Sequence, residues 1–215
     1  GSLSNENDYL ARKALWLESF GSFSVYSVYT VKSEQDFLYY SDSLYQERVA
    51  YLKNDKTLNK QFRSLSAKDD EFDLIVAIDS YAGFRRFYTK DEEFRKSDTF
   101  PEPIRDIDFD NPSWINLSSY RNAIVHWVNR KVGDVGVQEG EDWSLAWVKM
   151  MERSLQDKKV REVMSINWLS RMTSSKQVDS VYFYLDKMIT RKDFKKMALN
   201  AYRKVNKTAK GMPSP

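Results

Sequence analysis

Apolar side chains recur at three- and four-residue steps along most of this 215-residue chain, which is the spacing of one face of an α-helix. Strand-like patterning is confined to residues 22–31, where polar residues mix with β-branched and aromatic ones. A lone strand cannot form a sheet. The sequence therefore predicts an all-α fold, an irregular multi-helix bundle of antiparallel helix pairs, with one short extended segment at 22–31.

Apolar stripes and capping signals place the individual helices. Capping-box spacing occurs at Ser33–Asp36 and again at Thr89–Glu92, and Asp157 and Ser174 stand where N-caps are expected. Gly83 falls inside a stripe, which indicates close packing or a bend there. We expect helices at about 5–20, 33–54, 57–64, 68–88, 117–132, 141–155, 158–172 and 175–208, the last broken near Thr190.

This pattern predicts five segments. Residues 1–2 read as a cloning remnant, 3–96 as an N-terminal helical part, 97–116 as a Pro/Asp-rich connector, 117–209 as a C-terminal helical part and 210–215 as a tail. Short connections within 141–208 predict that 141–155 pairs with 158–172, and 175–189 with 192–208. Such pairs resemble the helix-turn-helix units of TPR-like arrays, although the sequence has no evident self-match at their usual period of about 34 residues.

The connector contains the one pattern that suggests a metal. Asp106, Asp108 and Asp110 have the spacing of the first three ligands of an EF-hand loop. The sixth position is Asn111 where that loop needs Gly, and the twelfth is Leu117 where it needs Glu. We therefore expect no metal site, and we expect these carboxylates to cap the next helix.

Residue usage excludes most catalytic classes. With no Cys there is no thiolate nucleophile, no disulfide and no sulfur-ligated metal, and the chain has no Gly-rich phosphate loop. Its single His, His126, lies in an apolar helical stretch, so we expect a structural role. A hydrolase using His126 is the weakest of the hypotheses and requires a Ser and a carboxylate within hydrogen-bond reach of His126, in a cleft. We predict no catalytic residue, no cofactor-binding residue and no cofactor.

Charge and aromatic residues bear on possible partners. Residues 149–210 carry 16 Lys and Arg against 6 Asp and Glu, although the net charge of the chain is only +3. Binding of nucleic acid or an acidic partner is thus one hypothesis, but the lysines fall at helical spacing without a nucleic-acid-binding motif, so we expect a solvated helix face and no nucleic-acid partner. No apolar run approaches the roughly 18 residues that cross a bilayer, so we expect no membrane span.

The aromatic residues of the C-terminal helical part are expected in the core: Trp143, Trp147, Trp168, Tyr182, Tyr184 and Tyr202.

Several segments resemble one known family. The tail Lys210-Gly-Met-Pro-Ser-Pro215 is similar to the Gly-x-Pro-Ala-Pro lead-in that precedes the first strand of TlpA/ResA-like thioredoxin domains. Upstream, the segments 106–111, 117–122 and 157–163 look like the helical region found before the thioredoxin domain in Bacteroidetes TlpA-family proteins. The resemblance covers about half of the chain, and residues 1–95 show no matching motif.

The resemblance implies a helical accessory domain of a cell-envelope thiol-disulfide oxidoreductase, whose Cys-x-x-Cys would lie beyond residue 215. Because thiol exchange needs a thiolate, the chain itself would be a non-catalytic scaffold or binding domain. Its implied partners are its own thioredoxin-like domain and a client protein, and its implied location is the periplasm or cell envelope. The alternative is a stand-alone TPR-like interaction module, which would display a groove lined by several of the aromatic residues named above.

Overall fold

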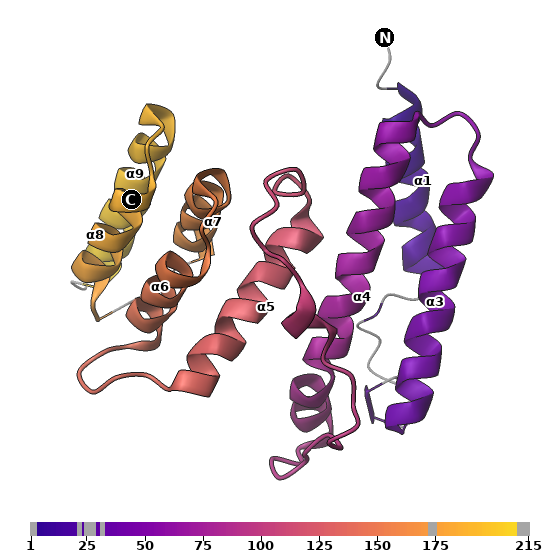
Figure 1. The fold of residues 1–215 in the computed structure, drawn as a ribbon, viewed down its shortest axis with the longest axis horizontal. Helices are drawn as coiled ribbons and strands as arrows, with labels where there is room; N and C mark the ends of the chain where they lie inside the picture. Colours follow the sequence, from indigo (N-terminus) through magenta and orange to yellow (C-terminus); the bar gives the residue numbers. More distant parts are fainter. Residues whose placement is uncertain (1–3, 21–22, 24–28, 31–32, 172–175, 210–215) are drawn as a thin grey trace. The chain divides into compact units, whose positions relative to one another are not determined.

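The structure is a computed structural model and describes residues 4–20, 23, 29–30, 33–171 and 176–209. These residues form eight α-helices and one 3-10 helix, and none of them lies in a strand, which confirms the all-α prediction (Figure 1). Most of the predicted extended segment 22–31 lies outside the described residues, as do Ser174 and the tail 210–215. Phe23, which is described, lies in a turn, and residues 29–30 are helical.

The chain divides into two compact units. Unit 1 comprises residues 1–107 and 117–123, and unit 2 comprises residues 108–116 and 124–215. The expected connector 97–116 is thus shared between the units, and helix α5 (Ser118–Val135) begins in unit 1 and continues in unit 2.

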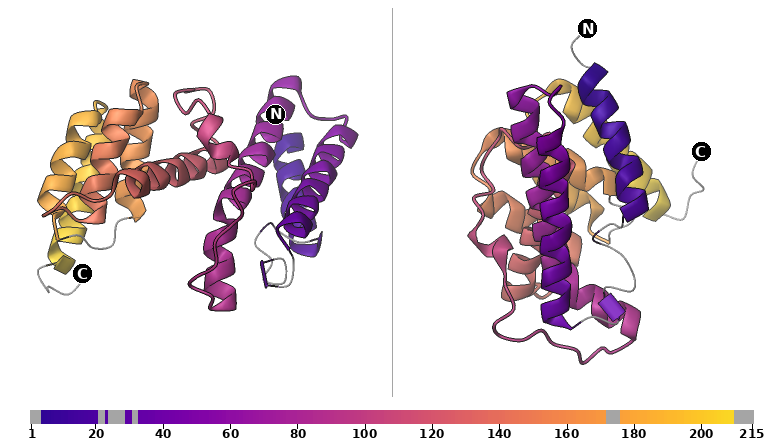
Figure 2. Two further views of the ribbon diagram at one scale, coloured as in Figure 1. Left: turned by 60° about the horizontal axis from the view of Figure 1, so that its bottom comes forward. Right: turned by 90° about the vertical axis from the view of Figure 1, so that its right-hand side faces the viewer.

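Unit 1 contains three long helices that lie side by side: α1 (Ser4–Phe20), α3 (Glu34–Asn54) and α4 (Lys60–Thr89) (Figures 1 and 2). The predicted capping box opens α3, since the Asp36 amide donates to Ser33 Oγ over 3.1 Å and the Ser33 amide donates to the Asp36 carboxylate over 3.4 Å. A short 3-10 helix, η1 (Pro103–Asp106), follows in the Pro-rich segment and packs on α4.

Two sequence-based expectations for α4 were wrong: the interruption near Ser64 and close packing at Gly83. The helix begins at Lys60 with Asn59 as its N-cap and has no interruption near Ser64, because residues 64–68 contain no Gly or Pro that would stop it. Gly83 makes no close contact, since an added Cβ would meet nothing within 4 Å. Thr89 ends α4 with its hydroxyl donating back to the Arg85 carbonyl over 2.7 Å, so it opens no new helix.

The core of unit 1 contains a charged cluster among apolar residues. Asp70, only 1 % exposed, lies 2.8 Å from Lys13 Nζ and 3.2 Å from a guanidinium nitrogen of Arg48. Arg48 also reaches Asp73 over 3.0 Å. These ion pairs link α1, α3 and α4, and removing a single partner would leave a buried charge without compensation.

Unit 2 is built from helix hairpins. Helix α6 (Trp143–Ser154) pairs with α7 (Lys158–Arg171), and α8 (Val178–Met188) pairs with α9 (Lys192–Ala209) (Figure 1). The predicted pairings and the break near Thr190 are therefore confirmed. The hairpins stack, since α6 contacts α8 and α7 contacts both α8 and α9.

Candidate functional site

The two hairpins of unit 2 have the same construction at an offset of 34 residues. Lys158 and Lys192 begin their second helices, and Leu155 and Ile189 are the C-cap residues of their first helices. Both C-cap side chains are almost completely buried. This offset is the period that the sequence did not reveal, and it matches the usual length of a TPR repeat.

A carboxylate holds each hairpin at the same place. Asp110 Oδ1 accepts the amide N–H groups of Gln156 and Asp157, over 2.7 and 2.8 Å, just ahead of α7. Glu162 Oε1 accepts the N–H groups of Thr190 and Arg191, each over 2.7 Å, just ahead of α9. The four donors are again 34 residues apart, and a carboxylate is favoured there because a helix N-terminus has unpaired N–H groups and a positive dipole end.

The Glu162 carboxylate, on α7, is held in its ionised form. Burial raises the pKa of this carboxyl, but the N–H groups of Arg191 and Thr190 and the Thr190 hydroxyl outweigh burial, so the pKa lies below its usual value. Glu162 therefore links the first hairpin to the turn of the second one in a charge-dependent way.

The face of the second hairpin that points away from the first is polar. Glu162, Ser165 and Leu169 lie on one face of α7 and are all buried. The equivalent face of α9 is largely exposed and mostly cationic: Lys192, Lys196, Leu199 and Arg203. Terminal units of helical arrays have such polar outer faces, so this side is a poor candidate for docking.

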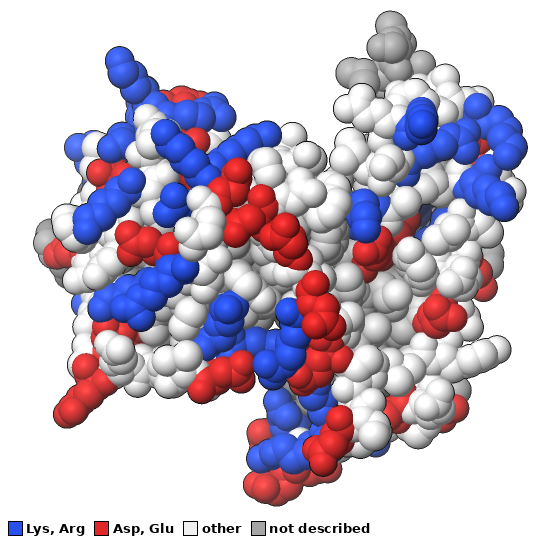
Figure 3. All heavy atoms as spheres, viewed as in Figure 1, with Lys and Arg blue, Asp and Glu red and all other residues white. Residues whose placement is uncertain are grey.

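The free side of the first helices of both hairpins is different, and we call it the α6–α8 surface. It consists of Lys149 and Arg153 on α6 and of Phe183, Tyr184 and Lys187 on α8. Phe183 is 57 % exposed, and Arg153 and Lys187 are exposed too. Figure 3 shows Lys and Arg side chains among Asp and Glu on one face of unit 2.

Cations and aromatic rings alternate along this surface. Lys187 Nζ lies 4.1 Å from the ring centroid of Phe183 and 5.3 Å from that of Tyr184. On α6, Lys149 Nζ lies 5.6 Å from the ring centroid of Tyr184, which belongs to α8. These are cation–π distances, so the rings fix the positions of two ammonium groups.

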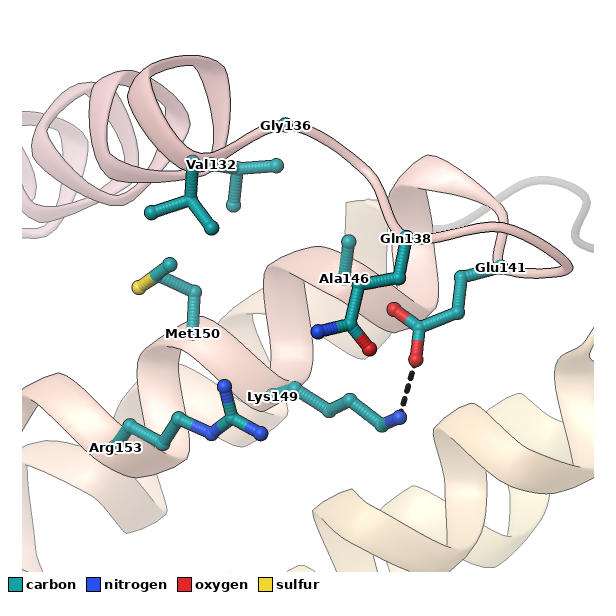
Figure 4. Close-up of a pocket in the computed structure, with 9 residues that line it drawn as sticks. Val132, Gly136, Gln138, Glu141, Ala146, Lys149, Met150 and Arg153 are labelled. Carbon is teal, nitrogen blue, oxygen red and sulfur yellow. Dashed lines mark hydrogen bonds and ion pairs between the residues drawn. The ribbon is translucent and has the colours of Figure 1, made fainter.

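A small hollow adjoins the surface between the end of α5 and α6. Val132 of α5 and Met150 of α6 point toward each other across it, while Lys149 turns to form an ion pair with Glu141 (Figure 4). The hydrogen bond from Lys149 to Glu141 raises the pKa of the Lys149 ammonium. The volume open to the centre of a water molecule is about 20 Å³, enough for about one water and too small for a metabolite.

The residues considered from the sequence are distributed as follows. His126 is partly buried on α5 and does not line this hollow. Asp110 caps a helix as expected, but the helix is α7, 47 residues away, and not the next one along the chain. Within the described residues no group of three or more His, Cys, Asp or Glu side chains is arranged to hold a metal ion. Nor does any helix in the described part of the chain have the length and apolar character to cross a membrane.

The aromatic residues expected in the core are divided. Trp147 is completely buried and stacks on Trp168, with ring centroids 3.9 Å apart and planes within 4°. Trp143, the first residue of α6, is 44 % exposed, so its core assignment was wrong. Sequence reasoning missed Phe183 and Lys187, whose only signal is the four-residue spacing of an aromatic and a cation on one helix.

Comparison with known proteins gives no relative. No protein-family model, curated protein or solved structure significantly matches this chain. The functional argument therefore depends on the site alone.

Proposed function

We propose that this chain is a non-catalytic helical scaffold that binds another protein through the α6–α8 surface of unit 2. The observation that carries the proposal is the pair of hairpins offset by 34 residues, which present Phe183, Lys187 and Arg153 on their free side. Stacked helix hairpins are a common architecture for such surfaces. The adjacent hollow, with room for about one water, favours a macromolecular partner over a small molecule.

Site-specific photo-crosslinking tests this function. A photoreactive phenylalanine analogue replaces Phe183 in the source cells, and the matched control replaces Phe87 on α4, which is also an exposed Phe, at 62 %. We expect discrete protein adducts from position 183 that are absent from position 87. Equal adduct patterns at both positions, or no adduct at 183, would contradict the proposal.

A second proposal is more specific: the scaffold serves a TlpA/ResA-like thiol-disulfide oxidoreductase of the cell envelope, next to its thioredoxin-like domain and a client protein. It is supported by the resemblance described above, and two of the segments that carry this resemblance are in contact, since Asp110 accepts the N–H of Asp157. The test is the reading frame after Pro215, which should encode a thioredoxin-like strand and a Cys-x-x-Cys. A frame without them would remove the redox proposal and leave the interaction module as the function.

A further inference from the structure

Resting on the proposed function, we propose that the α6–α8 surface selects an acidic polypeptide segment in which carboxylates flank an apolar side chain. The first argument is charge. The surface presents Lys149, Arg153 and Lys187, and a carboxylate already contacts it, since Glu141 pairs with Lys149. Glu141 shows that a carboxylate from an irregular segment fits here, because residues 136–142 between α5 and α6 are not helical.

The second argument is the position of the apolar contact. Phe183 exposes 57 % of its surface next to Lys187, so an apolar side chain that covers the ring places its neighbours close to the ammonium group. Tyr184 packs edge-on against Phe183, with planes at 84° and centroids 5.9 Å apart, which fixes the exposed ring. An apolar residue between acidic ones therefore matches the order of groups on the surface.

Two other occupants fit less well. A second copy of the chain would bring the same three cations against each other, which like-charge repulsion disfavours. Single-stranded nucleic acid binds through base stacking on free aromatic faces, and one face of Phe183 is already covered by Lys187 Nζ at 4.1 Å. An acidic polypeptide needs only the exposed part of the ring and the ammonium groups beside it.

Fluorescence anisotropy with the full chain tests this inference. The probe is a short fluorescein-labelled peptide of Glu-Glu-Leu repeats, compared with Gln-Gln-Leu and Glu-Glu-Gly versions and with a labelled single-stranded oligonucleotide. We expect the Glu-Glu-Leu peptide to bind at least about tenfold more tightly than the other two peptides and than the oligonucleotide, since both carboxylates and the apolar anchor contribute.

Matched charge reversals locate the binding. Lys187→Glu should weaken the Glu-Glu-Leu peptide about tenfold, and Lys187→Arg should retain its affinity. Lys196→Glu makes the same charge change on the outer face of α9 and should have little effect. Equal loss in the Lys187→Glu and Lys196→Glu variants would overturn the inference, because binding would then follow overall charge. Circular dichroism melts of the variants verify that they fold.

The remaining outcomes separate the two levels of the proposal. Tighter binding of the oligonucleotide, or equal binding of the Gln-Gln-Leu peptide, would overturn the acidic selectivity. If at the same time Phe183 still gives discrete protein adducts in cells, the protein-binding function stands without this selectivity. If those adducts are missing, the proposed function fails whichever peptide binds.

Discussion

The Glu162 contact can be tested by removing its charge and keeping its shape. In Glu162→Gln the side chain still reaches the N–H groups of Thr190 and Arg191, but hydrogen bonds to a carboxylate become bonds to a neutral amide oxygen. Hydrogen bonds to charged groups contribute about 1.5–3 kcal/mol and neutral ones about 0.5–1.5. We therefore expect Glu162→Gln to lower the free energy of unfolding of unit 2 by about 1–2 kcal/mol at pH 7.

The pH dependence gives this prediction its sign. Because the pKa of Glu162 is lower in the folded protein than in the unfolded chain, its stabilisation is complete above the ordinary Glu pKa of 4.5 and is lost as pH falls through the lower folded value. The difference in the free energy of unfolding between the native protein and Glu162→Gln should thus be constant over roughly pH 5.5 to 7.5, which lies well above that ordinary pKa, and should shrink in more acidic solution.

Urea unfolding followed by tryptophan fluorescence is the assay. Five of the six Trp residues belong to unit 2, and Trp16 is the one in unit 1, so the signal reports mainly on unit 2. Glu152→Gln, on a partly exposed position of α6, is the matched control and should change stability by less than about 0.5 kcal/mol. A Glu162→Gln loss that does not shrink below pH 4.5, or that equals the control, would refute the reasoning.

Four further substitutions test other positions in the two units. Asp110→Asn should destabilise unit 2 by about 1–2 kcal/mol in the fluorescence assay, because its carboxylate holds two N–H groups ahead of α7. Gly83→Ala should stabilise unit 1 by about 1 kcal/mol and so raise its melting temperature, because position 83 is helical and has room for a Cβ. Gly136→Ala should lower the melting temperature, because at φ +81° a side chain strains the backbone. Asp70→Asn should cost unit 1 about 3 kcal/mol or more, measured by far-ultraviolet circular dichroism in urea, since Lys13 and Arg48 lose their buried counter-charge. Melting temperatures that change in the same direction in the two glycine variants, or a loss of less than about 1 kcal/mol in Asp70→Asn, would contradict these arguments.

Much of the fold could be predicted because helices are determined by local signals. The capping box at Ser33 and the N-cap at Asp157 are present, the latter with the Val160 amide donating to Asp157 over 2.9 Å. The continuity of α4 was missed because the packing of one helix face along its length overrides the weak helix preference of the serines near position 64. Asp110 was assigned to the wrong helix because its partner is distant in sequence, which spacing alone cannot reveal.

The repeat in unit 2 was invisible in the sequence because burial repeats while residue type does not. Trp147 corresponds to Val181 and Met164 to Ala198, and all four are completely buried. A large side chain in one hairpin and a small one in the other fill different spaces at equivalent positions, so residue identity is lost although the packing is retained. The α6–α8 surface was missed as well. Its residues come together only when the two hairpins stack, and this stacking depends on the repeat that the sequence did not reveal.

The charge of one α9 residue shows why a partner of unit 2 should use the α6–α8 surface and not the outer face. The position equivalent to Glu162 is Lys196. If a third hairpin packed on α9 as the second packs on α7, Lys196 would bring an ammonium group to N–H donors at the positive end of a helix. The contact that holds the first hairpin to the second would then be repulsive. Stacking in this manner is thus disfavoured at α9, which supports our proposal that an acidic partner binds the exposed Phe183 and the neighbouring Lys187.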